Sequence, residues 1–67
     1  MQYEIRVRGV LGGGWSAWFD GLQVNSDERG QTTIAGPVPG QAALHGLLAK
    51  IRDLGLELLA VRRTDPD

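Results

Sequence analysis

The sequence predicts a small α+β domain in which two helices cover one face of a four-stranded antiparallel sheet. Residues 2–9 alternate between apolar and polar side chains, as a half-buried strand does. A long stretch in the second half repeats its apolar residues at helical spacing, and two short β-favouring segments flank a polar turn. With right-handed crossovers, the resulting order β-α-β-β-α-β predicts a ferredoxin-like sandwich.

The first strand is predicted from the alternation in residues 2–9. The face that we expect to be buried is apolar, and the opposite face is charged. The first face holds Tyr3, Ile5 and Val7, and the second holds Glu4, Arg6 and Arg8.

A short helix is predicted next, over residues 15–22, after a flexible glycine run. Its apolar residues recur at i, i+3, i+4 and i+7 and make one stripe: Trp15, Trp18, Phe19 and Leu22. A helix of about two turns is not stable alone, so we expect its aromatic rings to be buried in the core. In the alternative interpretation, Trp15 and Trp18 form a stacking platform for a ring-shaped ligand.

Two short strands are predicted in the middle of the chain, over residues 22–26 and 31–35. The polar segment between them ends at Gly30, so the pair predicts a β-hairpin. Val24 and Ile34 would point into the core.

The long helix is predicted over residues 40–54, where the apolar spacing fits a helix and no strand. Its stripe consists of Leu44, Leu47, Leu48, Ile51 and Leu54. Pro39 suits the start of the helix, and Gly55 suits the left-handed residue that ends it. A last strand follows over residues 56–63, with apolar side chains on both of its faces.

The composition bounds the class of protein. The 67 residues make one domain, predicted over 1–64 with a flexible tail at 65–67. There are no cysteines, so disulfides and thiolate metal sites are excluded. The net charge of −1 gives no global basic field for nucleic acid, and no apolar run is long enough for a membrane span. The start of the chain has no signal-peptide layout, and we expect a cytoplasmic protein.

An interaction surface is predicted on the sheet face that the helices leave open. The last strand should place Leu59 and Val61 there, and a domain this small often gains stability by association. A homo-oligomer, with a homodimer first, is the partner we expect; scattered apolar exposure is the alternative. The arginines of this face would contact phosphate if the partner were RNA, or would pair with nearby glutamates. The surface comprises Arg6, Arg8, Thr33, Leu59, Val61 and Arg63.

The glycine run is most simply a loose loop, and a candidate ligand pocket lies near it or at a subunit interface. A glycine run before a helix can form an anion cradle, although the lysine and hydroxyl of a phosphate-binding loop are missing. His45 is the only histidine, so a metal site or general base is not expected, and no paired carboxylates stand at catalytic spacing. We therefore expect no enzyme activity, cofactor or metal. The candidate pocket comprises Gly13, Gly14, Trp15, His45 and Arg52.

Three segments taken together resemble one family. They are WSAWFDGL, the threonine strand before GP, and QAALHGLLAKIRDLGLELLAVRR. The chain resembles short uncharacterised bacterial proteins with the signature WxxWFxGL and GPxxxQAALHGLLxxIRDLGLxLxxV, except that Gly12–Gly14 replaces a more polar turn. The resemblance implies a bacterial cytoplasmic protein of unassigned function and carries over no catalytic residue.

The expected function is that of a small non-enzymatic module that self-associates and acts through protein contacts. The predicted topology is also similar to that of ACT-like regulatory modules, and a small-molecule-binding regulatory domain is the alternative. RNA binding on the open sheet face is a second alternative.

Overall fold

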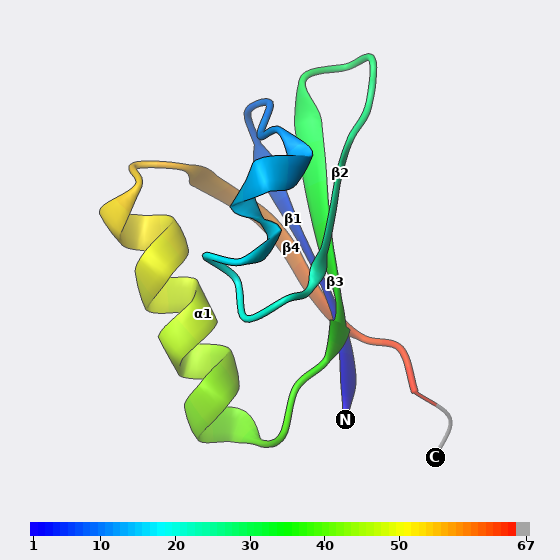
Figure 1. Ribbon diagram of the computed structural model, residues 1–67, viewed down its shortest axis with the longest axis vertical. Helices are drawn as coiled ribbons and strands as arrows, with labels where there is room; N and C mark the ends of the chain where they lie inside the picture. The colour runs from blue at the N-terminus through cyan, green and yellow to red at the C-terminus, as the bar shows by residue number, and fades with distance from the viewer. Residues whose placement is uncertain (66–67) are drawn as a thin grey trace.

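The computed structural model describes residues 1–65 as four strands, one α-helix and one short 3-10 helix (Figure 1). In chain order the elements are β1 (Gln2–Arg8), η1 (Gly13–Ser16), β2 (Gln23–Ser26), β3 (Gln31–Pro37), α1 (Gln41–Asp53) and β4 (Glu57–Arg63). The strands form one antiparallel sheet in the order β2-β3-β1-β4. The α+β class, the hairpin of β2 and β3 and the four antiparallel strands are confirmed.

The predicted two-helix ferredoxin-like sandwich is wrong, because residues 15–22 form no α-helix. Only Gly13–Ser16 are helical, as a 3-10 turn, and residues 17–21 form further turns. Glycine disfavours helix formation, and Asp20 and Gly21 adopt φ angles of 59° and 80°, which end a right-handed helix. The fold is a small α+β domain with a single α-helix.

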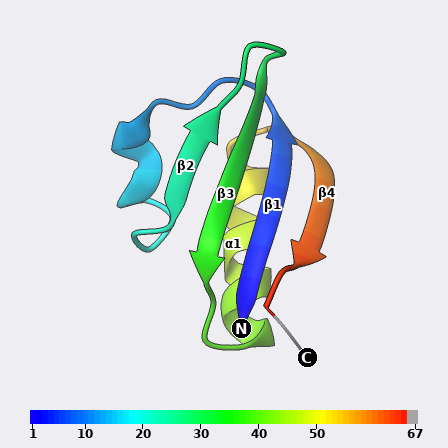
Figure 2. The same ribbon diagram turned by 90° about the vertical axis from the view of Figure 1, so that its right-hand side faces the viewer.

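The α-helix lies where its stripe predicts. Gly55 adopts a left-handed φ of 75°, its N–H donates to the Arg52 carbonyl at 2.9 Å, and the Leu56 N–H donates to the Ile51 carbonyl at 3.3 Å. These two bonds make a Schellman motif, which satisfies the last carbonyls of the helix. Figure 2 shows α1 behind β3 and β1, with β4 at one edge of the sheet and η1 beyond β2 at the other.

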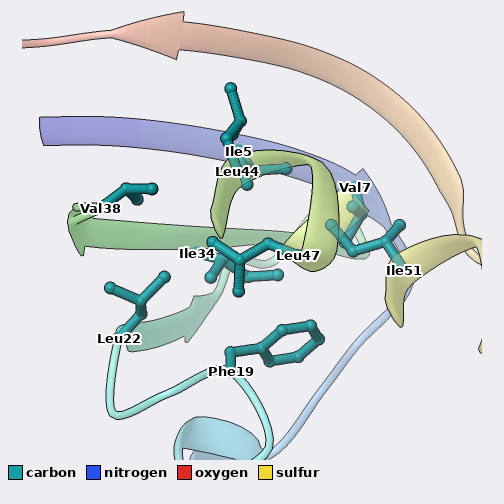
Figure 3. Packing of buried hydrophobic residues seen from close by; sticks show 9 residues of the cluster. All are labelled: Ile5, Val7, Phe19, Leu22, Ile34, Val38, Leu44, Leu47 and Ile51. Atoms are coloured by element: carbon teal, nitrogen blue, oxygen red, sulfur yellow. The ribbon is translucent and has the colours of Figure 1, made fainter. Parts of the chain in front are cut away.

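The core lies between the sheet and α1 (Figure 3). Its buried apolar residues are Ile5, Val7, Phe19, Leu22, Ile34, Val38, Leu44, Leu47 and Ile51. Val38 was not predicted; it follows β3 and exchanges backbone hydrogen bonds with Met1. The predicted burial of Trp15 and Trp18 is wrong, because their side chains are 37% and 48% exposed.

Phe19 fills the part of the core that α1 does not reach. Its ring is fully buried and lies beside Ile34 and Leu47 in Figure 3. The turn that carries it is closed by a hydrogen bond from the Gly21 N–H to the Ser16 carbonyl at 2.8 Å and by one from the Ser16 hydroxyl to the Leu22 carbonyl at 2.7 Å. A tight turn therefore covers the part of the core that the predicted second helix was expected to cover.

A hydrogen-bond network around Thr32 fastens the segment after β1 to the hairpin. Thr32 is fully buried, and its hydroxyl donates to the Gly9 carbonyl at 2.6 Å. The Leu11 N–H donates to the Ser26 and Thr32 hydroxyl oxygens, both at 3.1 Å. This network directs the chain from β1 toward η1.

We expect Thr32→Val to lower the free energy of unfolding by about 1–3 kcal/mol, because it leaves the Gly9 carbonyl and the Leu11 N–H short of partners. Urea unfolding followed by circular dichroism measures the change. Thr33→Val is the matched control, since this threonine is on the open face and outside the network. Equal stability of the two variants would show that the network contributes nothing.

Candidate functional site

Charged pairs line the open face of the sheet, opposite α1. The Glu4 carboxylate lies 3.4 Å from the Arg62 guanidinium and 3.6 Å from that of Arg6. At the other end of the same two strands, Arg8 donates to Glu57 at 3.0 Å. The sequence predicted that the open-face arginines either contact phosphate or pair with nearby glutamates. In the structure they pair with glutamates. Among residues 1–65, no aromatic side chain stands in the cross-strand rows of this face.

A register shift in β4 changes which side chains reach the open face. Arg6 pairs with Ala60, but Val7 pairs with Leu58, so Leu59 is an extra residue between them. Such a bulge reverses the alternation of the faces on one side of it.

The shift corrects the predicted surface. Val61 pairs with Ile5, and Arg63 pairs with Tyr3, so both lie on the α1 side of the sheet. Arg6, Arg8 and Thr33 lie on the open face as expected, and they are joined there by Ala60 and Arg62. The simple alternation of residues 56–63 could not reveal a bulge.

Two apolar side chains of β4 remain exposed at the edge of the sheet. Leu58 is 46% exposed and Val61 is 39% exposed, and both pair with core residues of β1. They therefore lie on the α1 side of the sheet, in the strand at its edge. Glu57 precedes this apolar pair in the strand, and Arg62 and Arg63 follow it.

The structure does not bring the predicted ligand pocket together. His45 and Arg52 are exposed on α1, whereas Gly14 and Trp15 belong to η1. No Cα atom of η1 comes within 8 Å of one in α1. The flank of α1 that faces the η1 turn carries Lys50, and at about 100° per residue His45 and Arg52 lie on roughly the opposite flank. Gly13, the fifth residue of the set, opens η1.

Lys50 connects α1 to the two exposed tryptophans. Its Nζ donates to the Trp18 carbonyl at 2.8 Å and lies 5.6 Å from the centre of the Trp18 ring. Trp15 and Trp18 pack edge to face, with ring centres 6.4 Å apart. Lys50 lies off the apolar stripe of the helix, and no local sequence signal marks this contact.

A shallow cavity of about 640 Å³ opens on the sheet where β1 begins and β3 and β4 end. No pattern along the chain predicts this cavity, because its lining comes from all four strands. The lining consists of Gln2, Tyr3, Glu4, Gly21, Leu22, Gln23, Ala35, Gly36, Pro37, Arg62 and Thr64.

Two aspartates are held ionised by local hydrogen bonds. The Gln31 and Arg29 N–H groups donate to the Asp27 carboxylate at 3.0 and 2.8 Å, which lowers the pKa of Asp27. Hydrogen bonds from the Arg63 guanidinium and the Gln2 N–H lower the pKa of Asp65 strongly. Asp65 is thus tied to β1 and β4, while the rest of the predicted tail, residues 66 and 67, lies outside the described residues.

Within residues 1–65, no group of three or more His, Cys, Asp or Glu side chains is placed to hold a metal ion. In the same range, no helix combines the length and apolarity needed to cross a membrane.

Fold and surface together define a small α+β domain with one helix, an apolar sheet edge and a polar cavity. A family model described as "Domain of unknown function (DUF8691)" matches residues 2–62, and the chain belongs to this family. The match is consistent with the uncharacterised family that the motifs predicted. None of the curated proteins and none of the solved structures compared with the chain matches it.

The Asp27 turn predicts an acid-dependent stability. Because its folded pKa is lowered, the Asp27 carboxylate stabilises the fold above its ordinary pKa of about 3.9, and this contribution is lost as pH falls through the folded value. We expect Asp27→Asn to lose less stability than the unmodified protein between about pH 5 and pH 2 in urea unfolding.

Glu28→Gln is the control, since within the described chain that neighbouring carboxylate accepts no hydrogen bond. The free energy of unfolding of this variant should fall with decreasing pH as steeply as that of the unmodified protein. If the free energy of unfolding of Asp27→Asn fell with decreasing pH as steeply as that of Glu28→Gln, the stabilising role of the Asp27 carboxylate would be contradicted.

Proposed function

We propose that this domain is a small non-enzymatic interaction module that self-associates through the outer edge of β4. The observation that carries the proposal is the exposure of Leu58 and Val61 on an edge strand. An edge strand leaves one side of its backbone unpaired, and exposed apolar side chains next to it favour contact with a second chain.

A second copy fits this edge by charge. The apolar pair has Glu57 on one side of it in the strand and Arg62 and Arg63 on the other. A two-fold axis that sets two β4 strands antiparallel places the acidic end of each against the basic end of its partner. The surface is therefore self-complementary, with apolar side chains at the centre and opposite charges at the rim.

The bulge at Leu59 shapes the contact. It interrupts the regular spacing of the free backbone groups, and natural edge strands use such bulges to limit sheet extension. We therefore propose that the dimer forms mainly by side-chain packing and that it does not extend into longer assemblies. A seven-residue strand is about 23 Å long, which favours a small and reversible interface.

We also propose that the protein is bacterial and cytoplasmic. The motifs that resemble bacterial proteins support a bacterial origin, and the absence of cysteine is compatible with a reducing cytoplasm.

Val61→Glu should shift the protein toward the monomer, because it buries an unpaired carboxylate in the interface. Sedimentation equilibrium over a range of micromolar concentrations measures the change. Val10→Glu is the matched control, since Val10 is 70% exposed and lies outside β4. An unmodified protein that stays monomeric throughout this range would refute the proposal.

Charge exchange tests the antiparallel arrangement separately. Glu57→Arg and Arg62→Glu should each weaken association, because each sets like charges against one another across the two-fold axis. The double variant restores opposite charges and should recover most of the affinity. If the double variant is weaker than both single variants, the two strands do not meet in this orientation.

A further inference from the structure

One cross-strand row of side chains on the open face supplies four of the residues that line the cavity. The register aligns Gln23 with Ala35, Ala35 with Glu4, and Glu4 with Arg62, across β2, β3, β1 and β4 in turn. Ala35 is small and stands between two longer side chains, so the row is hollow at its centre. A volume of about 640 Å³ lies within the range of roughly 300–1,000 Å³ that is usual for small-molecule sites.

Both signs of charge meet at one side of this cavity. The Glu4 side chain is only 26% exposed, and its Oε1 atom receives both the Arg62 contact at 3.4 Å and the Arg6 contact at 3.6 Å. Within residues 1–65, no hydrogen bond reaches Glu4 Oε2, and Arg62 uses one of its five N–H donors in its bond to Glu4. An acceptor and several donors therefore remain for a ligand.

The arrangement discriminates by charge type. A simple anion would meet the Glu4 carboxylate as well as Arg62, and a simple cation would meet Arg62 as well as Glu4. A ligand that carries an ammonium group and a carboxylate a few ångströms apart satisfies both signs. The amide of Gln23, across Ala35, can donate or accept a further hydrogen bond.

We infer that this cavity is a binding site for a small zwitterion, with free α-amino acids as the ligand class. Glu4 receives the ammonium group, and Arg62 donates to the carboxylate. The inference goes beyond self-association, because Glu4 and Arg62 lie on the sheet face opposite the one where Leu58 and Val61 lie.

The test is a nuclear magnetic resonance titration of the full chain, labelled with ¹⁵N, with glycine, leucine and glutamine at millimolar concentrations. Saturable shifts should map to the amides of Glu4, Ala35, Gly36 and Arg62. Acetate and methylammonium, which each carry one of the two charges, should bind about tenfold more weakly or worse, since each loses a charge-assisted hydrogen bond.

Variants test the two charged residues. Glu4→Gln and Arg62→Gln should each weaken amino-acid binding about tenfold, whereas Arg8→Gln should leave it unchanged. Arg8 is the matched control, because its pair with Glu57 joins the same two strands outside the cavity. Circular dichroism of each variant verifies the fold.

The inference is overturned if no amino acid shifts these amides, if the shifts map to β4's apolar pair or to η1, or if acetate binds as tightly as glycine. Sedimentation of the same samples reports self-association on its own. If the protein is a monomer that binds glycine in the cavity, the proposed self-association is refuted and the amino-acid site is supported. If it is a dimer that binds no amino acid, the amino-acid site is refuted and self-association is supported.

Discussion

The fold depends on a mismatch of widths between its two layers. Four strands spaced about 4.8 Å apart make a sheet roughly 15–20 Å across, whereas one α-helix with its side chains is about 10 Å wide. α1 lies behind β3 and β1 (Figure 2), and one helix does not bury the side chains of both edge strands. On the β2 side the chain supplies Phe19 and Leu22 from a tight turn. On the β4 side no described segment does so, and Leu58 and Val61 stay exposed.

Phe19 can act as this cover only because the backbone around it is unusual. Two consecutive left-handed residues, Asp20 and Gly21, bring the chain back toward β2 within a few residues. Leu22 then packs so close to Gly36, which has a φ of 150°, that a Cβ atom there would lie 2.7 Å from Leu22 Cδ2. A Cβ atom at that position would force the Leu22 side chain to shift from its present packing. The cover on the β2 side therefore depends on short-range geometry at glycine and not on a second helix.

Local patterns predicted the elements that local forces determine. The alternation of β1, the polar turn of the hairpin, and the stripe and glycine stop of α1 are each encoded within a few residues, and all three are confirmed. The segment of Trp15 and Trp18 has helical spacing, but it is too short for nucleation to favour an α-helix without strong burial. The bulge in β4 depends on pairing with β1, and the cavity depends on residues from all four strands. No pattern along the chain contains either feature.

The bulge links the two surfaces that the proposals use. If the pairing of Val7 with Leu58 continued without a shift, Glu4 would face Val61 instead of Arg62. The open face would then gain an apolar side chain and lose the arginine that gives the cavity its second sign of charge. The sheet edge would in turn lose Val61, leaving Leu58 without its apolar neighbour. One extra residue in an edge strand thus sets Val61 on the α1 side and Arg62 on the open face, so that an apolar contact surface and a charged cavity can share a strand of seven residues.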